Sequence, residues 1–199
     1  MRSQALEIEL YTKNIFVLYS PGLGGNHVAN LLSTDSRYVT KATSIDYANH
    51  NKPNAHIIMG NLENVKNAKS IKNNIFCGHL NEFHNLYTEN IICKFDNRQI
   101  IIIDFPKSFD CLAYKRYAKY SKLKGYFSAE QKMLYSPEIF NKLFNETDFF
   151  TVPAEIIFND SIDSFFDYAN YEMNFNLDYT ECFQMHNIWI QKIKDYVKQ

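Results

Sequence analysis

The feature that most constrains the fold is a glycine-rich break between an apolar segment and a helical pattern, close to the start of the chain. Residues Asn14–Ser20 (NIFVLYS) are mostly β-branched, aliphatic or aromatic, which is typical of a strand buried on both faces. The segment PGLGG ends this strand, and residues Asn26–Leu32 (NHVANLL) then carry apolar side chains at helical spacing. The sequence therefore predicts a strand, a glycine loop and a helix in that order.

Strand-like and helix-like segments alternate along the rest of the chain. We expect further strands at Ile57–Met59, Asn74–Gly78, Gln99–Asp104 and Phe149–Val152. We expect further helices at Leu62–Ile71, Lys107–Ser121, Ala129–Tyr135, Pro137–Phe144, Ser161–Met173 and Tyr179–Val197. Pro106 fits the start of the helix expected over Lys107–Ser121. A loop is expected over residues 33–55. This alternation predicts an α/β fold: a three-layer sandwich with a mainly parallel sheet and a P-loop-like start, in one domain over residues 1–199.

The composition excludes several classes of protein. Hydrophobic residues make up 46% of the chain and charged residues 22%, so a disordered protein is not expected. The 21 basic residues are balanced by 22 acidic ones, which does not suit a broadly basic nucleic-acid binder. No apolar run approaches the ~20 residues of a membrane span, and residues 1–13 do not resemble a signal peptide. We therefore expect a cytoplasmic protein without a membrane span or a nucleic-acid partner; its oligomeric state does not follow from the sequence.

Three segments follow expected strands, and parallel sheets bind ligands beyond the carboxyl ends of their strands. These segments are the glycine loop, Gly78-His79 and Asp104–Lys107. In a loop between a strand and a helix, glycines allow backbone amides to point at an anion, and the helix N-terminus adds a partial positive charge. The alternative is a structural tight turn. The residues expected to contact the anion are Gly22, Leu23, Gly24, Gly25, Asn26 and His27.

The order of these pieces resembles the sulfotransferase superfamily, a P-loop-related α/β group. Pro21–Asn26 (PGLGGN) lies in register with the family's PKSGTT-type loop, and Gly78-His79 matches its base-bearing Gly-His pair. Ile101–Pro106 occupies the place of the strand that ends in Arg-x-Pro, and Phe149–Ile156 (FFTVPAEI) that of a late strand with a Glu-containing motif. The resemblance covers most of the chain and rests on order and hydrophobic pattern.

This resemblance implies a sulfuryl transfer from the donor PAPS to a hydroxyl or amine of a small-molecule or glycan acceptor. The glycine loop would hold the 5′ end of the donor, and His79 would take the proton of the acceptor. No metal is needed for this reaction. Two cationic positions of the family differ, because Gly22 replaces the loop Lys or Arg and Asp104 replaces the Arg before Pro. Nearby residues that can supply the missing contacts are Lys107, Ser108 and Arg116.

Two other functions fit the same pattern. The chain can be a P-loop nucleotide kinase or NTPase relative with a degenerate loop, in which Asp104 would hold magnesium. It can also be a non-catalytic binding or assembly domain, in which His79 has a structural role. His79, Glu82 and His84 are close in sequence, but their spacing matches no standard zinc pattern, so we expect no metal site there.

Overall fold

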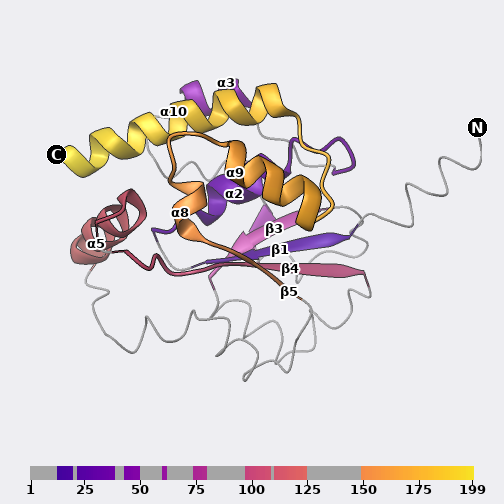
Figure 1. The fold of residues 1–199 in the computed structure, drawn as a ribbon, viewed down its shortest axis with the longest axis horizontal. Coiled ribbons are helices and arrows are strands. Elements are labelled where there is room, and N and C mark those ends of the chain that lie inside the picture. The colour runs from indigo at the N-terminus through magenta and orange to yellow at the C-terminus, as the bar shows by residue number, and fades with distance from the viewer. Residues whose placement is uncertain are drawn as a thin grey trace, which may run out of the picture.

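The computed structural model describes residues 13–19, 22–38, 43–49, 60–61, 74–79, 97–108, 110–124 and 149–199. Its centre is a five-stranded sheet in which every neighbouring pair of strands is parallel. The strands are β1 (Asn14–Leu18), β2 (Gly60–Asn61), β3 (Ile75–Gly78), β4 (Arg98–Ile103) and β5 (Phe149–Val152). They lie in the order β2-β3-β1-β4-β5 (Figure 1). The expected α/β fold with a parallel sheet is confirmed.

Strand β1 occupies the middle of the sheet, with β3 on one side and β4 on the other. Ile15 lies opposite Ile75 of β3 and opposite Gln99 of β4. Every residue of β1 is buried, as expected for a strand covered on both faces and paired at both edges. The β-branched and aromatic content of the segment NIFVL favours this position, because such side chains pack well on a pleated surface.

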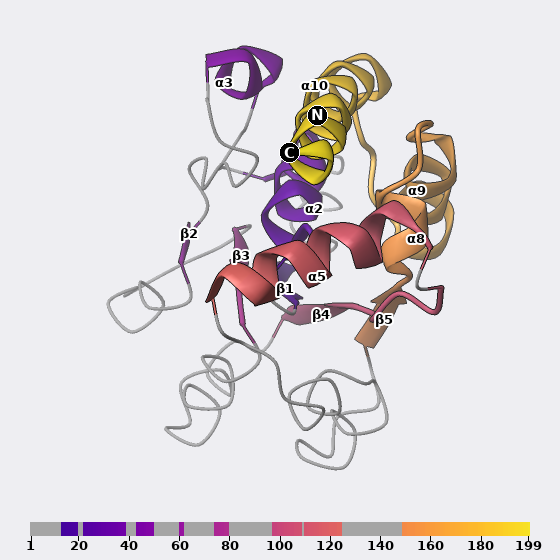
Figure 2. The same ribbon diagram turned by 90° about the vertical axis from the view of Figure 1, so that its left-hand side faces the viewer.

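The described helices are α2 (Gly25–Leu32), α3 (Ser44–Asn49), α5 (Leu112–Lys124), α8 (Ala154–Ile157), α9 (Asp163–Asp167) and α10 (Tyr179–Lys198). Helices α2, α8, α9 and α10 lie over the same face of the sheet, and α10 passes above α2 (Figure 1). Seen along the strands, α5 lies across one end of the sheet (Figure 2). The second helical layer of the three-layer sandwich stays a prediction, because the described helices supply the layer on this one face.

The core lies between the sheet and this helical layer. Alternate strand residues, such as Val17 of β1 and Ile101 of β4, face the helices and are fully buried. Helix α2 buries almost its whole surface, since it is enclosed by the sheet below and α10 above. The last helix contributes an apolar stripe at helical spacing, formed by Cys182, Met185, Trp189, Ile190 and Ile193.

Three local expectations were wrong. Helix α5 begins at Leu112 instead of Lys107, and in the loop before it the amide of Lys107 donates to the carboxylate of Glu155 (2.6 Å). Pro106 therefore lies in a loop. The expected loop over 33–55 contains α3, and the helix expected over Ser161–Met173 changes to a π-helical turn at Tyr168–Glu172.

Four expected elements lie outside the described residues: the strand Ile57–Met59 and the helices Leu62–Ile71, Ala129–Tyr135 and Pro137–Phe144. Among the helices that the structure describes, none is both long and apolar enough to cross a membrane.

Candidate functional site: a glycine loop with a buried arginine

The strand order places the glycine loop at a point where the connections of the sheet diverge. After β1 the chain continues to β2 at one edge of the sheet, and after β4 it continues to β5 at the opposite edge. Since β1 and β4 are neighbours, their carboxyl ends flank this divergence, which is where open parallel sheets bind ligands. The loop after β1 and the segment 104–108 after β4 both lie there.

The glycine loop has a backbone that requires glycine at two positions. Gly22 and Gly24 have φ angles of 93° and 79°, in the left-handed region that other L-residues rarely adopt. Gly24 is the N-cap of α2, and its carbonyl accepts the first helical hydrogen bond from the amide of Val28 (3.0 Å). The amides of the first helical turn therefore have no acceptor within the helix. Within the described part of the chain, no acceptor bonds the amide of Gly25.

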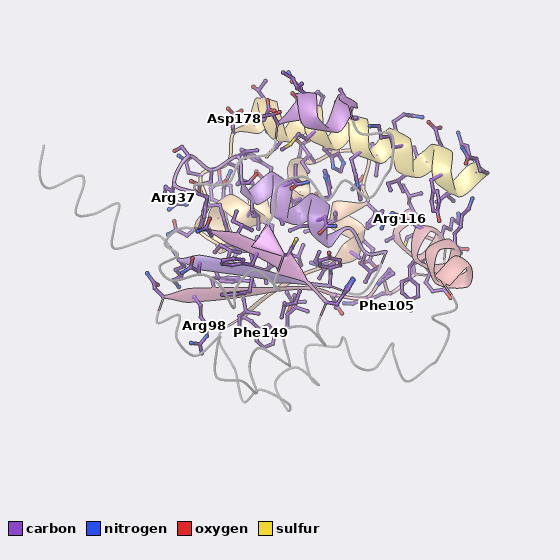
Figure 3. All side chains as sticks on the ribbon, turned by 180° about the vertical axis from the view of Figure 1, so that it is seen from behind. Arg37, Arg98, Phe105, Arg116, Phe149 and Asp178 are labelled. Carbon is purple, nitrogen blue, oxygen red and sulfur yellow. The ribbon has the colours of Figure 1, made fainter. Side chains whose placement is uncertain are left out.

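A buried cation lies beside this loop. Arg116 of α5 is only 4% exposed, and its Nη1 donates to the carbonyl of Gly22. Its guanidinium also lies 5.8 Å from the ring centre of Phe158 and 5.9 Å from that of Trp189, which is the geometry of a cation–π contact. Figure 3 shows Arg116 and Phe105 near one end of the molecule, and Arg37 and Arg98 near the other end.

The contact of Arg116 also orients the loop. The described peptide bonds are trans, so the carbonyl and the following amide of one peptide unit point in opposite directions. Because the Gly22 carbonyl points at Arg116, the amide of Leu23 points away from it. The side chain of Leu23 is fully buried, so this residue offers the site only its backbone.

Tyr19 links the loop to the neighbouring strand. Its hydroxyl donates to Oδ1 of Asn26 (2.7 Å), which also accepts from the thiol of Cys77 (3.0 Å). The ring of Tyr19 covers Gly25 so closely that a Cβ atom added at Gly25 would lie 1.8 Å from Tyr19 Cδ1. Gly25 is therefore a glycine because of this close approach of the Tyr19 ring.

His79 lies beside Tyr19, directly after β3. Its Nδ1 is 3.1 Å from the carbonyl oxygen of Tyr19, and the two rings meet edge to face at 5.0 Å. A carbonyl only accepts hydrogen bonds, so Nδ1 carries a proton, and in a neutral ring the lone pair is then on Nε2. The side chain is partly exposed. A neutral imidazole fixed in one tautomer is the arrangement that a general base needs.

The side chain of His27 lies in the core. Its side chain is 2% exposed and packs against α10, where Nε2 lies 3.2 Å from Nδ1 of His186. Its ring stacks on Trp189 with 4.0 Å between ring centres. The ring is part of the core in this structure, and the contact of His27 with an anion stays a prediction. The backbone amide of His27 still lies in the first turn of α2.

Lys107 and Ser108 are exposed. The amide of Lys107 donates to Glu155, and Ser108 Oγ accepts from the amide of Asp110 (3.3 Å). Oδ1 of Asp104 accepts from the amide of Phe105 (2.7 Å). Of the three residues expected to replace the missing cation, Arg116 is the one that contacts the loop.

A metal site is not indicated by the described residues, which contain no group of three or more potential His, Cys, Asp or Glu ligands. Glu82 and His84 lie outside the described residues, so the expectation for that segment stays a prediction.

Sequence reasoning missed the contribution of Phe158 and Trp189 to this site. Both side chains pack on Gly24, where an added Cβ atom would lie 3.3 Å from Phe158 and 3.2 Å from Trp189. The only available signal was that Trp189 is the single tryptophan of the chain.

The chain matches no protein-family model, no curated protein and no solved structure. Any assignment of function therefore rests on the geometry of the site.

Proposed function

We propose that the Gly22–His27 loop binds the sulfate- or phosphate-bearing end of a nucleotide donor of the PAPS type, and that the protein transfers a sulfuryl group to a hydroxyl or amine. The observation that carries this proposal is the contact of the buried Arg116 guanidinium with the glycine loop, beside the first turn of α2. The P-loop-like start and the three-layer sandwich expected from the sequence belong to the same proposal.

The electrostatics of the loop support an anionic ligand. Helix N-termini attract anions through their free amides and the helix dipole, and the segment GNHV at the start of α2 contains no acidic side chain. Arg116 adds a full positive charge from α5, and its guanidinium donates to the carbonyl of Gly22. Arg116 thereby supplies the charge that the glycine at position 22 does not.

His79 is the candidate base in this reaction. Its Nε2 would take the proton of the acceptor while the acceptor oxygen or nitrogen forms a bond to sulfur. The bond between sulfur and the bridging oxygen of the donor breaks, and the nucleotide bisphosphate leaves with the electron pair. The amides of α2 and the charge of Arg116 stabilise the negative charge that develops on the leaving group.

Binding is tested by isothermal titration and thermal unfolding with PAP, PAPS, ATP and GDP. A ligand at a hundred times its dissociation constant should raise the unfolding free energy by ~2.7 kcal/mol. Arg116→Met should weaken binding of PAP by roughly 10- to 100-fold, because a hydrogen bond to a charged group contributes ~1.5–3 kcal/mol. Lys115→Met is the matched control: Lys115 is exposed on the same helix, and its loss should leave affinity within about twofold.

Catalysis is tested with the variant His79→Gln in a sulfuryl-transfer assay with a panel of acceptors. The rate should fall by ~10²–10⁴ while PAP affinity is retained. A magnesium-dependent preference for ATP would instead support the kinase or NTPase alternative. Binding of PAP by an inactive wild type would support a non-catalytic binding module. Failure of every anionic ligand to bind would contradict the proposal as a whole.

A further inference from the structure

An aromatic surface is exposed where α9 and the start of α10 lie side by side. The exposed large apolar side chains of the described residues are Ile45, Tyr171, Tyr179 and Phe183, and the last three belong to this region. Tyr171 is 83% exposed, and Tyr179 and Phe183 are 44% and 46% exposed. With the partly exposed Phe166, these three residues form what we call the aromatic face. Apolar side chains that cluster at a surface mark interaction sites, whereas single ones carry no such meaning.

Contacts within the aromatic face hold its rings in place. The ring of Phe166 meets that of Tyr179 edge to face at 5.0 Å, and the rings of Tyr179 and Phe183 are 6.0 Å apart at an interplanar angle of 23°. The hydroxyl of Tyr179 donates to Oδ1 of Asp163 (2.8 Å), whose Oδ2 accepts from Ser161 Oγ (2.6 Å). The face is therefore ordered before any partner binds, which lowers the entropic cost of association.

A π-helical turn presents the most exposed ring of the face. Helix α9 continues into this turn over Tyr168–Glu172, and Tyr171 lies within it. The hydroxyl of Tyr168 donates to the carbonyl of Thr151 at the sheet (3.0 Å), which anchors the turn on its inner side. Turns of this kind are rare and are often found at functional sites. Tyr171 thus extends into solvent from an anchored backbone.

The surroundings of the aromatic face are acidic. Residues 149–191 contain no lysine or arginine. Their acidic residues are Glu155, Asp160, Asp163, Asp167, Glu172, Asp178 and Glu181. The hydrogen bond to Asp163 raises the pKa of Tyr179, and the charges of Asp163 and Asp167 raise it further, so both carboxylates lie close to this ring. The aromatic face is therefore flanked by negative charge.

The cations of neighbouring elements do not neutralise this charge. Arg37 pairs with Asp35 and also donates to the carbonyl of Asn174 (2.7 Å). Lys194 of α10 pairs with Asp160 at 2.6 Å. Nucleic acids and anionic membranes carry the same sign of charge as the surface and are repelled by it. Charge complementarity therefore selects a cationic partner.

Arginine is the cationic side chain that suits both features of this surface. Its guanidinium stacks on aromatic faces and forms paired hydrogen bonds with carboxylates, whereas the ammonium of lysine acts as a point charge. We propose that the aromatic face and its flanking carboxylates dock an arginine-bearing segment of a partner protein.

This surface is separate from the glycine loop. A helical rise of ~1.5 Å per residue places Tyr179 about 15 Å along α10 from Trp189, the residue that packs on Gly24. Figure 1 shows the start of α10 beside α9 and its end beside α5. Docking at the aromatic face therefore leaves the loop open to a ligand of its own.

The test is calorimetric titration of the full chain with an oligoarginine peptide, an oligolysine peptide of the same length and an oligoglutamate peptide. The arginine peptide should bind at least about threefold more tightly than the lysine peptide, and the glutamate peptide should not bind. In amide spectra recorded during the titration, the signals of α9, the π-helical turn and the first turns of α10 should shift, and those of the Gly22–His27 loop should not.

Variants separate the rings from the charges. Tyr171→Ser should weaken binding of the arginine peptide about two- to fivefold and reduce its advantage over the lysine peptide; the high exposure of this ring means that its loss leaves the fold intact. Asp167→Asn should weaken binding of both peptides to a similar extent. Asp195→Asn is the matched control, because Asp195 is exposed on α10 about 24 Å from Tyr179, beyond the ~8 Å screening length at physiological salt.

Three results would overturn the proposal. Equal affinity for the arginine and lysine peptides would show that the rings take no part. An equal loss of affinity in Asp195→Asn and Asp167→Asn would show attraction by net charge alone. A dimer of the chain by itself in sedimentation experiments, dissociated by Tyr171→Ser, would show that a second copy covers the aromatic face instead.

Discussion

Replacement of Gly25 by alanine is expected to destabilise the protein by about 2–4 kcal/mol. The Cβ atom of alanine would lie 1.8 Å from Cδ1, 2.1 Å from Cγ and 2.3 Å from Cε1 of Tyr19, so the ring must leave its position. Forcing extra atoms into a packed site costs ~1–3 kcal/mol. Displacing the ring also breaks the hydrogen bond from its hydroxyl to Asn26, measured at 2.7 Å, which adds about 1 kcal/mol.

The same substitution should have the opposite effect once the ring of Tyr19 is removed. The backbone of Gly25 does not have a positive φ, unlike that of Gly22 and Gly24, so alanine fits its conformation. In a Tyr19→Ala background, Gly25→Ala should therefore be neutral or stabilising by about 0.5–1 kcal/mol, which is the helix preference of alanine over glycine. The two substitutions should then show an interaction energy of at least about 2 kcal/mol.

The assay is urea unfolding of the wild type, both single variants and the double variant, followed by far-ultraviolet circular dichroism. Each unfolding free energy comes from the midpoint and the slope of the transition. Constant slopes would show that the variants share the same denatured state. An equal cost of Gly25→Ala in both backgrounds would refute the reasoning, because the loss would then have no connection to the ring of Tyr19.

Three further predictions concern parts of the fold around the site. Asp35 is fully buried and accepts hydrogen bonds from the backbone and side chain of Arg37. Asp35→Asn should therefore lower the unfolding free energy by about 3 kcal/mol in urea unfolding, and a loss under about 1 kcal/mol would contradict this prediction. Asp178 caps α10, so Asp178→Ala should cost about 1 kcal/mol in the same assay, whereas Asp178→Ser should restore most of it. Because the pKa values of His27 and His186 are lowered in the folded state, the unfolded state binds more protons below about pH 6.5. As pH decreases below that value, the unfolding free energy should therefore decrease by up to ~1.4 kcal/mol per pH unit for each proton, and His27→Gln should flatten this profile. A flat wild-type profile down to about pH 5 would be inconsistent with this prediction.

The sequence predicted the fold correctly where the structure of a segment follows from its own residues. The apolar run of β1 and the glycines after it predict a buried strand, a turn and a helix, because these preferences are local to each segment. The start of α5 was not predictable in this way. The loop before α5 makes a hydrogen bond from the amide of Lys107 to Glu155, which lies 48 positions later in the chain, and such a long-range contact leaves no local signal.

The candidate site shows the same division. The alternation of strands and helices identified the glycine loop and His79 as residues that follow strands. For the cation that Gly22 and Asp104 do not supply, the sequence offered three candidates, of which Arg116 was one. The choice of Arg116 over Lys107 and Ser108 comes from the packing of α5 across the end of the sheet, which no local signal encodes (Figure 2). The packing of the His27 side chain was not predictable, because its partner His186 lies 159 positions away in the sequence.

The central position of β1 also bears on how the chain is assembled. Its partners are distant in sequence: Ile15 pairs with Ile75 on one side and with Gln99 on the other. During synthesis β1 and α2 therefore emerge well before either neighbouring strand exists, and α10, which covers α2, is made last of the described elements. Such long-range pairing slows folding and leaves apolar segments exposed meanwhile. Nascent chains that stop before Tyr179 should therefore bind chaperones more strongly than the full chain does, since Trp189 and Ile193 are then missing from the core.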